Sequence, residues 1–292
     1  MKNDLLLLTT AAIWGFAFVA QRSGMAFIGP HTYNALRFFL GALSLFPLFL
    51  YSAHGNRVHR HLRQGKWFEV LLAGLFLFGG SALQQMGIVY TSAGKAGFIT
   101  GFYVVLVPLL GGLFGLRSGK RGWTGAILAL SGLYFLSVHG SLSIAFGDLL
   151  VMISALFFAS HVLYLSRITV RFDPVSLSIG QYLVCAVLSL AAALFSGESI
   201  DSSSLAGAFP SIAYGGIMSV GVAYSLQIVA QRRAHPTHAA IILCMESLFA
   251  ALGGALLLSE RLSSRELFGA ALMFAGMLVS QVRKRVRERA ER

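Results

Sequence analysis

Long apolar runs alternate with short polar gaps along the whole chain, and this pattern predicts helices that cross a membrane. A crossing helix needs about 20 mainly apolar residues. We count ten such runs, at about 4–24, 31–51, 68–90, 95–116, 122–139, 147–166, 174–195, 207–230, 237–259 and 265–283. The expected fold class is therefore an all-α integral membrane protein with ten transmembrane helices.

Matching residues recur at a spacing of 144, which predicts that the chain consists of two similar halves. The matches include Asp4 with Asp148, Pro30 with Pro174, Arg37 with Gln181, and Gly132 with Gly276. Each half holds five helices, an odd number, so the second copy must be inserted upside down. Inverted repeats around a site at the membrane midplane are typical of secondary transporters. We expect one repeat over 1–142 and the other, with a basic cytoplasmic tail, over 143–292.

Composition supports a lipid surrounding. The 292 residues are 56% hydrophobic and 12% charged, whereas a soluble domain carries roughly 25% charged residues. A net charge of +12 is also typical of nucleic-acid-binding proteins. Here, however, the basic residues lie in short gaps between apolar runs, as membrane topology requires. We therefore expect the lipid bilayer, and no nucleic acid, as a partner.

The distribution of basic residues predicts the orientation. If the N-terminus is cytoplasmic, the cytoplasmic gaps hold eighteen of the 23 Lys and Arg residues and the outer gaps hold four. Such a bias is typical of multi-pass proteins, whose cytoplasmic loops are rich in Lys and Arg. Both termini are therefore expected in the cytoplasm, and the location in the cell (inner) membrane. Lys95 begins a helix near the outer face, where a long basic side chain commonly reaches toward water.

Polar side chains interrupt two apolar stretches, 82–113 and 223–258, that occupy matching places in the two halves. In lipid such groups must face a partner or a wet cavity. We therefore expect one cavity built from both copies. Its predicted substrate-binding residues are Trp14, Gln84, Gln85, Tyr103, His161, Tyr164, Tyr224, Gln227 and His238. The same groups also fit hydrogen bonds that only hold helices together, and this alternative stays open.

Two charged residues lie deep in predicted helices. Glu246 is a carboxylate near the middle of a span, and a buried carboxylate is typical of a proton carrier or a partner for a cationic ligand. A protonated or paired structural role is its alternative. Arg37 is a deep base. We expect it to be a structural charge that bonds helix-end carbonyls, with binding of an anionic group as the alternative.

The sequence shows no signature of catalysis. It lacks a phosphate-binding glycine loop, an HExxH motif and a Gly-x-Ser-x-Gly elbow, so we expect no enzyme activity, no cofactor and no metal site. Cys185 and Cys244 lie in apolar runs, and we interpret them as small core residues. Small-residue stripes around Gly132 and Gly276 indicate close helix packing, within a monomer or across a homodimer.

Several segments together resemble the EamA family of the drug/metabolite transporter superfamily. They are AAIWGFAFVAQ, YTSAGKAGFITGFYVVLVP and ALLLSERLSSRELFGAALMFAGMLV. The resemblance implies a ten-helix inverted-repeat carrier whose first, third, fourth, sixth, eighth and ninth helices line a cavity. Family members mostly export amino acids, metabolites or toxic compounds. One departure is Glu246-Ser247, where the family often has Glu-Pro, which puts flexibility of the ninth helix in question.

The resulting hypothesis is a secondary active transporter that exports small organic solutes by alternating access. One rival class is a membrane-embedded enzyme that modifies lipids or headgroups, which would need a nucleophile and a base that converge. Another is a non-transporting membrane protein that only interacts with partners. Its polar side chains would form hydrogen bonds between helices and would leave no cavity.

Overall fold

The protein is described here by a computed structural model that covers residues 2–54, 66–91, 93–138, 145–198, 201–257 and 263–281. Helices and short turns account for this part of the chain, and it contains no strand. Seven of its helical stretches are long and apolar enough to cross a membrane. The prediction of an all-α membrane protein is confirmed at this level.

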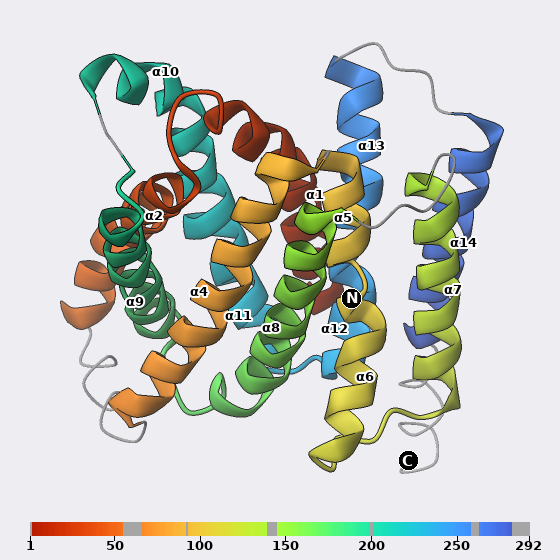
Figure 1. Cartoon of the computed structure of the whole chain (residues 1–292). Coiled ribbons are helices and arrows are strands. Elements are labelled where there is room, and N and C mark those ends of the chain that lie inside the picture. Colours follow the sequence, from red (N-terminus) through yellow and green to blue (C-terminus); the bar gives the residue numbers. More distant parts are fainter. Residues whose placement is uncertain are drawn as a thin grey trace.

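The helices follow one another with few residues between them (Figure 1). They are α1 (Lys2–Gly24), α2 (Pro30–His54), α4 (Trp67–Tyr90), α5 (Ala93–Thr100), α6 (Tyr103–Leu113), α7 (Lys120–Ser137), α8 (Phe146–Ile168), α9 (Pro174–Phe195), α10 (Ser202–Ala213), the π-helix η1 (Tyr214–Tyr224), α11 (Ser225–Gln231), α12 (Pro236–Leu243), α13 (Glu246–Leu257) and α14 (Ser264–Gln281). Three sets run on as nearly continuous rods: α5 with α6, α10 with η1 and α11, and α12 with α13.

Local chemistry explains where two of these helices begin. Asp173 precedes α9 and accepts a hydrogen bond from the Ser176 amide at 2.9 Å, while Pro174 fits the first helical turn. Asp201 caps α10 in the same way. Hydrogen bonds from Ser203 and Ser204 hold the pKa of the Asp201 carboxyl below its ordinary value.

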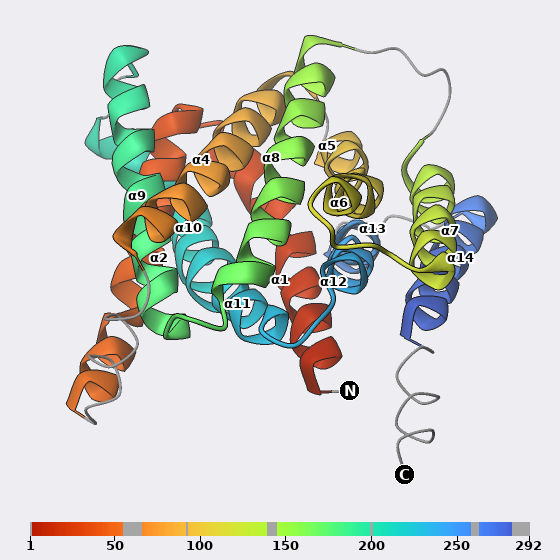
Figure 2. The ribbon, with the colours of Figure 1, turned by 90° about the horizontal axis from the view of Figure 1, so that it is seen from below.

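Two helix pairs flank the centre of the bundle. The α2–α9 pair lies at one side and the α7–α14 pair at the other, and the remaining helices fill the space between them (Figures 1 and 2). The largest cluster of buried apolar side chains gathers around α5, α6, α12 and α13. Large apolar residues such as Phe195 and Leu113 are instead exposed on the outside, as expected for a surface in contact with lipid.

Glycines bring α7 and α14 into close contact. A Cβ atom on Gly132 would lie 2.4 Å from the Gly269 carbonyl oxygen, and one on Gly125 would lie 2.8 Å from the Gly276 carbonyl oxygen. Such distances leave no room for a side chain, and small residues allow this approach in membrane helices. The predicted small-residue stripes thus contact one another within a single chain.

Candidate functional site: a polar cavity between two broken helices

Two helices are interrupted near the middle of the bundle. The chain turns at Gly101–Phe102 between α5 and α6, and at Cys244–Met245 between α12 and α13. The backbone there tightens to bonds between residues three apart, such as the Phe102 amide with the Ile99 carbonyl at 3.1 Å. The two rods run in opposite directions (Figure 1) and contact each other, α6 against α12 and α5 against α13. Two helix N-termini, those of α6 and α13, therefore begin inside the protein.

A cavity lies beside these breaks and is lined by side chains from both halves of the chain. Its volume is about 40 Å³, where one water molecule needs roughly 10–15 Å³. The cavity therefore has room for a few water molecules. The predicted residues that line it are Trp14, Arg37, Gln84, Tyr103, His161, Tyr224, Gln227 and Glu246.

Glu246 and Tyr103 meet across the cavity. The Tyr103 hydroxyl donates to Oε1 of Glu246 at 3.4 Å, a long hydrogen bond. Both residues are the first of their helices, α13 and α6, and both are buried. The positive end of the α13 dipole favours a negative charge at Glu246. Glu246 is also the one carboxylate among the described residues that line this cavity.

Arg37 faces the same cavity from α2. Its Nε donates to Oδ1 of Asn34 at 2.9 Å, and Asn34 in turn donates to the Ser81 carbonyl at 3.0 Å. The guanidinium carbon lies 5.6 Å from the Tyr33 ring centroid and 5.1 Å from that of Phe38. Within the described residues, no hydrogen bond or carboxylate partner is found for its two terminal nitrogens. The expected bonds to helix-end carbonyls are thus not seen.

Trp14, His161 and Tyr224 form one wall of the cavity, and Phe38 packs against Tyr224 from outside the lining. The ring centroids of Trp14 and Tyr224 are 4.5 Å apart, and those of Phe38 and His161 lie 6.2 and 6.3 Å from Tyr224. Trp14 is oriented by a hydrogen bond from its Nε1 to the Ser219 carbonyl at 3.1 Å. This wall is apolar and offers ring faces, on which flat or cationic groups pack favourably.

Amide groups complete the polar lining. Nε2 of Gln84 donates to the Thr100 hydroxyl at 3.0 Å. The Oε1 atoms of Gln21 and Gln227 are buried and have no hydrogen-bond partner among the described protein atoms. Buried polar atoms are nearly always paired. These two acceptors therefore point to water or a solute as the missing donor.

Three predicted substrate-binding residues lie outside the lining. Gln85 is fully buried, and neither of its amide atoms has a partner in the described part of the chain. Tyr164 packs on the Phe76 ring at 5.8 Å. His238 bonds Asp4, near one end of the bundle. The structure thus separates these side chains from the cavity.

The cavity also includes residues that the sequence did not single out as binding residues. Gln21, Thr100, Ser219 and Phe158 line it. Gln21 belongs to the helical stripe of Trp14 and Phe18, and Thr100 lies one turn before Tyr103, so periodicity was a usable signal for both. Ser219 lies in η1, and no pattern in the sequence indicates a π-helix there.

The remaining candidate ligands and nucleophiles are the histidines, carboxylates and cysteines of the described residues. Among the described residues, no three of the His, Cys, Asp and Glu side chains are grouped so that they could hold a metal ion. Cys185 and Cys244 are buried. The arrangement of apolar helices around a small polar cavity defines a multi-pass α-helical membrane protein.

Comparison with known proteins places this chain within one family. The model of the EamA-like transporter family matches residues 1–138 and 145–281. The chain belongs to this family of transporters, which is part of the drug/metabolite transporter superfamily.

Individual relatives agree with this assignment. An uncharacterized transporter of Archaeoglobus fulgidus is 29% identical over 96% of this chain and 86% of its own length. Protein PA1977 of Pseudomonas aeruginosa is 31% identical over 89% of this chain and 88% of its own length. The uncharacterized transporter YoaV of Bacillus subtilis is 22% identical, over 96% of this chain and 97% of its own.

A solved crystal structure shows the same fold. It aligns with a TM-score of 0.80 at 19% identity and covers 100% of this chain and 99% of its own. At this identity the likeness concerns the fold alone.

Proposed function

We propose that the protein is a secondary active transporter that exports small organic solutes (amino acids, metabolites or drug-like compounds) by alternating access at this cavity. One observation carries the proposal: the cavity lies where two oppositely running, broken helices meet, and side chains from both halves line it. Broken helices whose inner ends face a central site are typical of secondary transporters.

The expected ten-helix inverted repeat is part of the proposal, with the halves at 1–142 and 143–292. Its main support is that contacts occur in matching sets. In one set α8 packs on α4, α5 and α6; in the other α1 packs on α10, η1, α11, α12 and α13. The α2–α9 and α7–α14 pairs each join equivalent helices. The family model also matches each half. We keep the inner membrane, with both termini cytoplasmic, as the proposed setting.

Glu246 is proposed to carry the proton or cation that drives transport. A carboxylate at this depth is costly in lipid unless it serves a function. Its position at the start of α13 suits the charged form, and Tyr103 is a neutral hydrogen-bond partner. Binding or release of a proton or cation at Glu246 would therefore act directly on the break between α12 and α13.

Arg37 is proposed to hold an acidic group of the solute. Its Nε is occupied by Asn34, which leaves the planar pair of terminal nitrogens that suits a carboxylate. An unpaired buried charge is strongly unfavourable, so an anionic ligand would stabilise it. Gln84 and Gln227 are proposed to add hydrogen bonds, and the Trp14–Tyr224 wall to contact the apolar part of the solute.

The small volume of the cavity favours a cycle of conformations over a fixed pore. A cavity of about 40 Å³ is too small for a typical organic ligand, whose sites measure about 300–1,000 Å³. Binding of such a solute thus requires the two halves to move apart. The structure corresponds, in this proposal, to a contracted state between the two open ones.

The test begins with ligand identification on the purified protein in detergent. Its melting temperature is measured with single amino acids, nucleosides, organic acids and organic amines, because a ligand that binds only the folded state raises stability. A hit is then followed as labelled solute in proteoliposomes, with and without a proton gradient. We expect uptake driven by the gradient in the wild type.

Variants assign the roles. Glu246→Gln is expected to retain exchange of labelled for unlabelled solute but to lose the response to the proton gradient. Tyr103→Phe is expected to lower the affinity for the solute about fivefold, which is the equivalent of one hydrogen bond. Asp201→Asn, an exposed carboxylate outside the cavity, is the matched control. No flux above empty liposomes for any ligand, or a gradient response that survives Glu246→Gln, would overturn the proposal.

A further inference from the structure

Two ion pairs occupy equivalent places in the two halves. Nζ of Lys95 lies 2.5 Å from Oδ2 of Asp148, and Nε2 of His238 lies 3.0 Å from Oδ1 of Asp4. Asp4 and Asp148 are 144 residues apart, and Lys95 and His238 are 143 apart. Each pair joins the first turn of an unbroken helix, α8 or α1, to the first turns of a broken one, α5 or α12.

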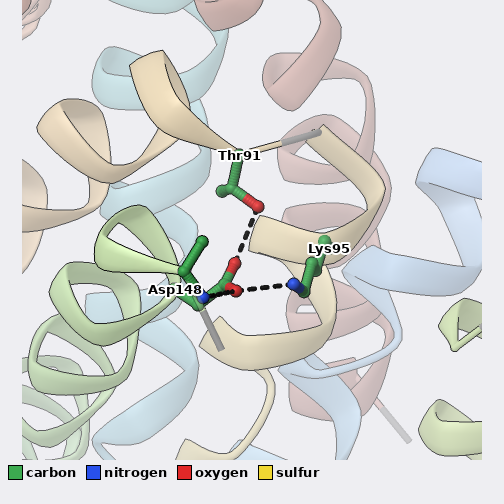
Figure 3. Close-up of polar contacts among 4 residues, drawn as sticks. Thr91, Lys95 and Asp148 are labelled. Carbon is green, nitrogen blue, oxygen red and sulfur yellow. Dashed lines mark hydrogen bonds and ion pairs between the residues drawn. The ribbon is translucent and has the colours of Figure 1, made fainter. Parts of the chain in front are cut away.

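The Lys95 pair, Lys95 with Asp148, is buried on its acidic side. The Asp148 side chain is 2% exposed. It accepts hydrogen bonds from the Thr91 hydroxyl at 2.8 Å and from the Ala145 amide at 2.7 Å, in addition to Lys95 (Figure 3). A carboxylate surrounded by three donors is well compensated for its burial. Lys95 thus binds a specific partner, where the sequence suggested only a side chain that reaches toward water.

The His238 pair, His238 with Asp4, also has a third member. Nδ1 of His238 lies 2.8 Å from the Ser280 hydroxyl oxygen, whose own hydrogen bond goes to the Met277 carbonyl at 2.7 Å. The His238 ring thus bridges Ser280 on one side and Asp4 on the other. His238 is equivalent to Lys95 in position, as the residue that joins the broken helix to the aspartate.

The two pairs lie on opposite sides of the cavity. Lys95 comes five residues before Thr100, and His238 comes five residues before Leu243, and both Thr100 and Leu243 line the cavity. Five helical residues span about 7.5 Å. The two broken helices run in opposite directions (Figure 1), so Lys95 and His238 lie toward opposite ends of the bundle. We name these ends the α5 end and the α12 end.

Each pair also joins the two halves of the chain. Lys95 belongs to the first half and Asp148 to the second, whereas Asp4 belongs to the first and His238 to the second. Motion of one half against the other would therefore have to separate one pair at each open end. In this structure both pairs are formed and the cavity is small.

We propose that the Lys95 pair closes the α5 end of the cavity and that the His238 pair closes the α12 end. Each opens while the other stays formed, so access alternates between the two ends. This inference rests on the proposed transport function and adds four residues that neither line the cavity nor bind the solute. The Thr91 and Ser280 hydroxyls position the two pairs.

The experiment follows access to a cavity residue from each side of the membrane. Ser219→Cys places a thiol in the lining, in a chain whose Cys185 and Cys244 are replaced by Ala. Labelling by a membrane-impermeant maleimide is measured in intact cells and in everted membrane vesicles. Lys95→Ala is expected to raise the rate severalfold from the α5 end and to lower it from the α12 end. His238→Ala is expected to do the reverse.

Controls separate gating from damage to the fold. Lys95→Met keeps most of the apolar stem of the side chain without its charge if Lys95→Ala folds poorly, and the same direction is expected. Lys95→Arg, which keeps a cation beside Asp148, is expected to retain the wild-type ratio. Arg232→Ala, whose guanidinium bonds the Thr169 and Phe172 carbonyls within the second half, is expected to leave the ratio unchanged.

Two results would overturn the inference: equal changes from both sides in either variant, or a labelling ratio that stays at the wild-type value in both. Labelling needs no solute and no gradient. A protein that transports solute but shows neither shift would therefore refute the gating pairs and leave the proposed function intact.

Discussion

The α5 end and the α12 end of the molecule each carry an aspartate paired with a side chain of a broken helix, but the two aspartates differ in burial and in their hydrogen bonds. At the α5 end the acidic partner is almost fully buried and has three donors. At the α12 end, Asp4 is 28% exposed and its histidine partner 17% exposed. Because Lys95 is itself 33% exposed, the two pairs differ in the burial of the carboxylate and in its number of donors, and a buried carboxylate with several hydrogen bonds is costlier to lose than a partly exposed one. Equivalent positions therefore need not have equal energies.

A second contact increases this difference. At the α5 end, Glu198 of the second half accepts hydrogen bonds from the His31 and Thr32 amides at the start of α2, at 3.1 and 2.7 Å. The equivalent helix start in the second half, that of α9, is capped by its own Asp173. At the α12 end the further ion pair, Arg171 with Glu69, is half exposed. The halves also meet at the α12 end, where the Ser118 and Thr237 hydroxyls lie 2.6 Å apart and Arg167 donates to the Phe114 carbonyl at 2.9 Å, but neither contact involves a carboxylate. On that ground we expect the α12 end to open more readily.

The largest effect is expected for Asp148→Ala. The substitution leaves the Lys95 ammonium, the Thr91 hydroxyl and the Ala145 amide without their shared acceptor. A hydrogen bond to a charged group contributes about 1.5–3 kcal/mol, and Asp148 accepts from three donors. We expect a clear fall in melting temperature of the purified protein. A decrease no larger than that of Asp4→Ala would show that the two ends are equally strong.

Glu198→Ala is expected to have the next largest effect, because it removes a charged acceptor from two amides of α2. Hydrogen bonds to a charged group contribute about 1.5–3 kcal/mol. Labelling of the Ser219→Cys thiol should increase from the α5 end, since this contact also joins the two halves. If stability falls without any change in labelling, Glu198 is a helix cap and takes no part in the closing of that end.

Much of this architecture follows from sequence patterns. Runs of apolar residues predicted helices because a membrane demands them over a fixed length. Trp14, Gln84, Tyr103, Tyr224 and Gln227 were expected to share one cavity, and all five line the cavity in the structure; their role in binding stays a prediction. Helical periodicity is a property of the backbone and so can be read without knowledge of the packing.

Other features depend on how the helices pack. The repeat spacing matched Asp4 with Asp148, yet their partners come from other helices, and nothing local specifies Lys95 or His238 as those partners. The break at Cys244–Met245 contains neither Gly nor Pro, so composition gave no sign of it. The family often has Pro after the acidic residue, and with Ser247 in that place α12 and α13 are still separate.

Asp173→Ala tests whether the start of α9 differs in role from the start of α2. It removes the cap of α9, a contact that stays within the second half. The cost of a lost N-cap is typically about 1 kcal/mol. We therefore expect a smaller fall in melting temperature than for Glu198→Ala, with the same labelling from both ends. A shift in labelling toward one end would mean that local capping also controls access, and that the contrast with Glu198 is unfounded.

The smallest effect on stability, and a directional effect on access, is expected for Asp4→Ala. The pair with His238 is partly exposed and, like other ion pairs near a surface, contributes about 0–1 kcal/mol, so the melting temperature should hardly change. The same energy, if it acts only on the state that is closed at the α12 end, changes the ratio of open to closed molecules by up to about fivefold. Labelling from the α12 end should rise accordingly. Asp4→Ala combined with His238→Ala should add little to either single change, because residues of one pair are not additive. Full additivity would mean that the two side chains act separately and that the His238 pair does not close this end.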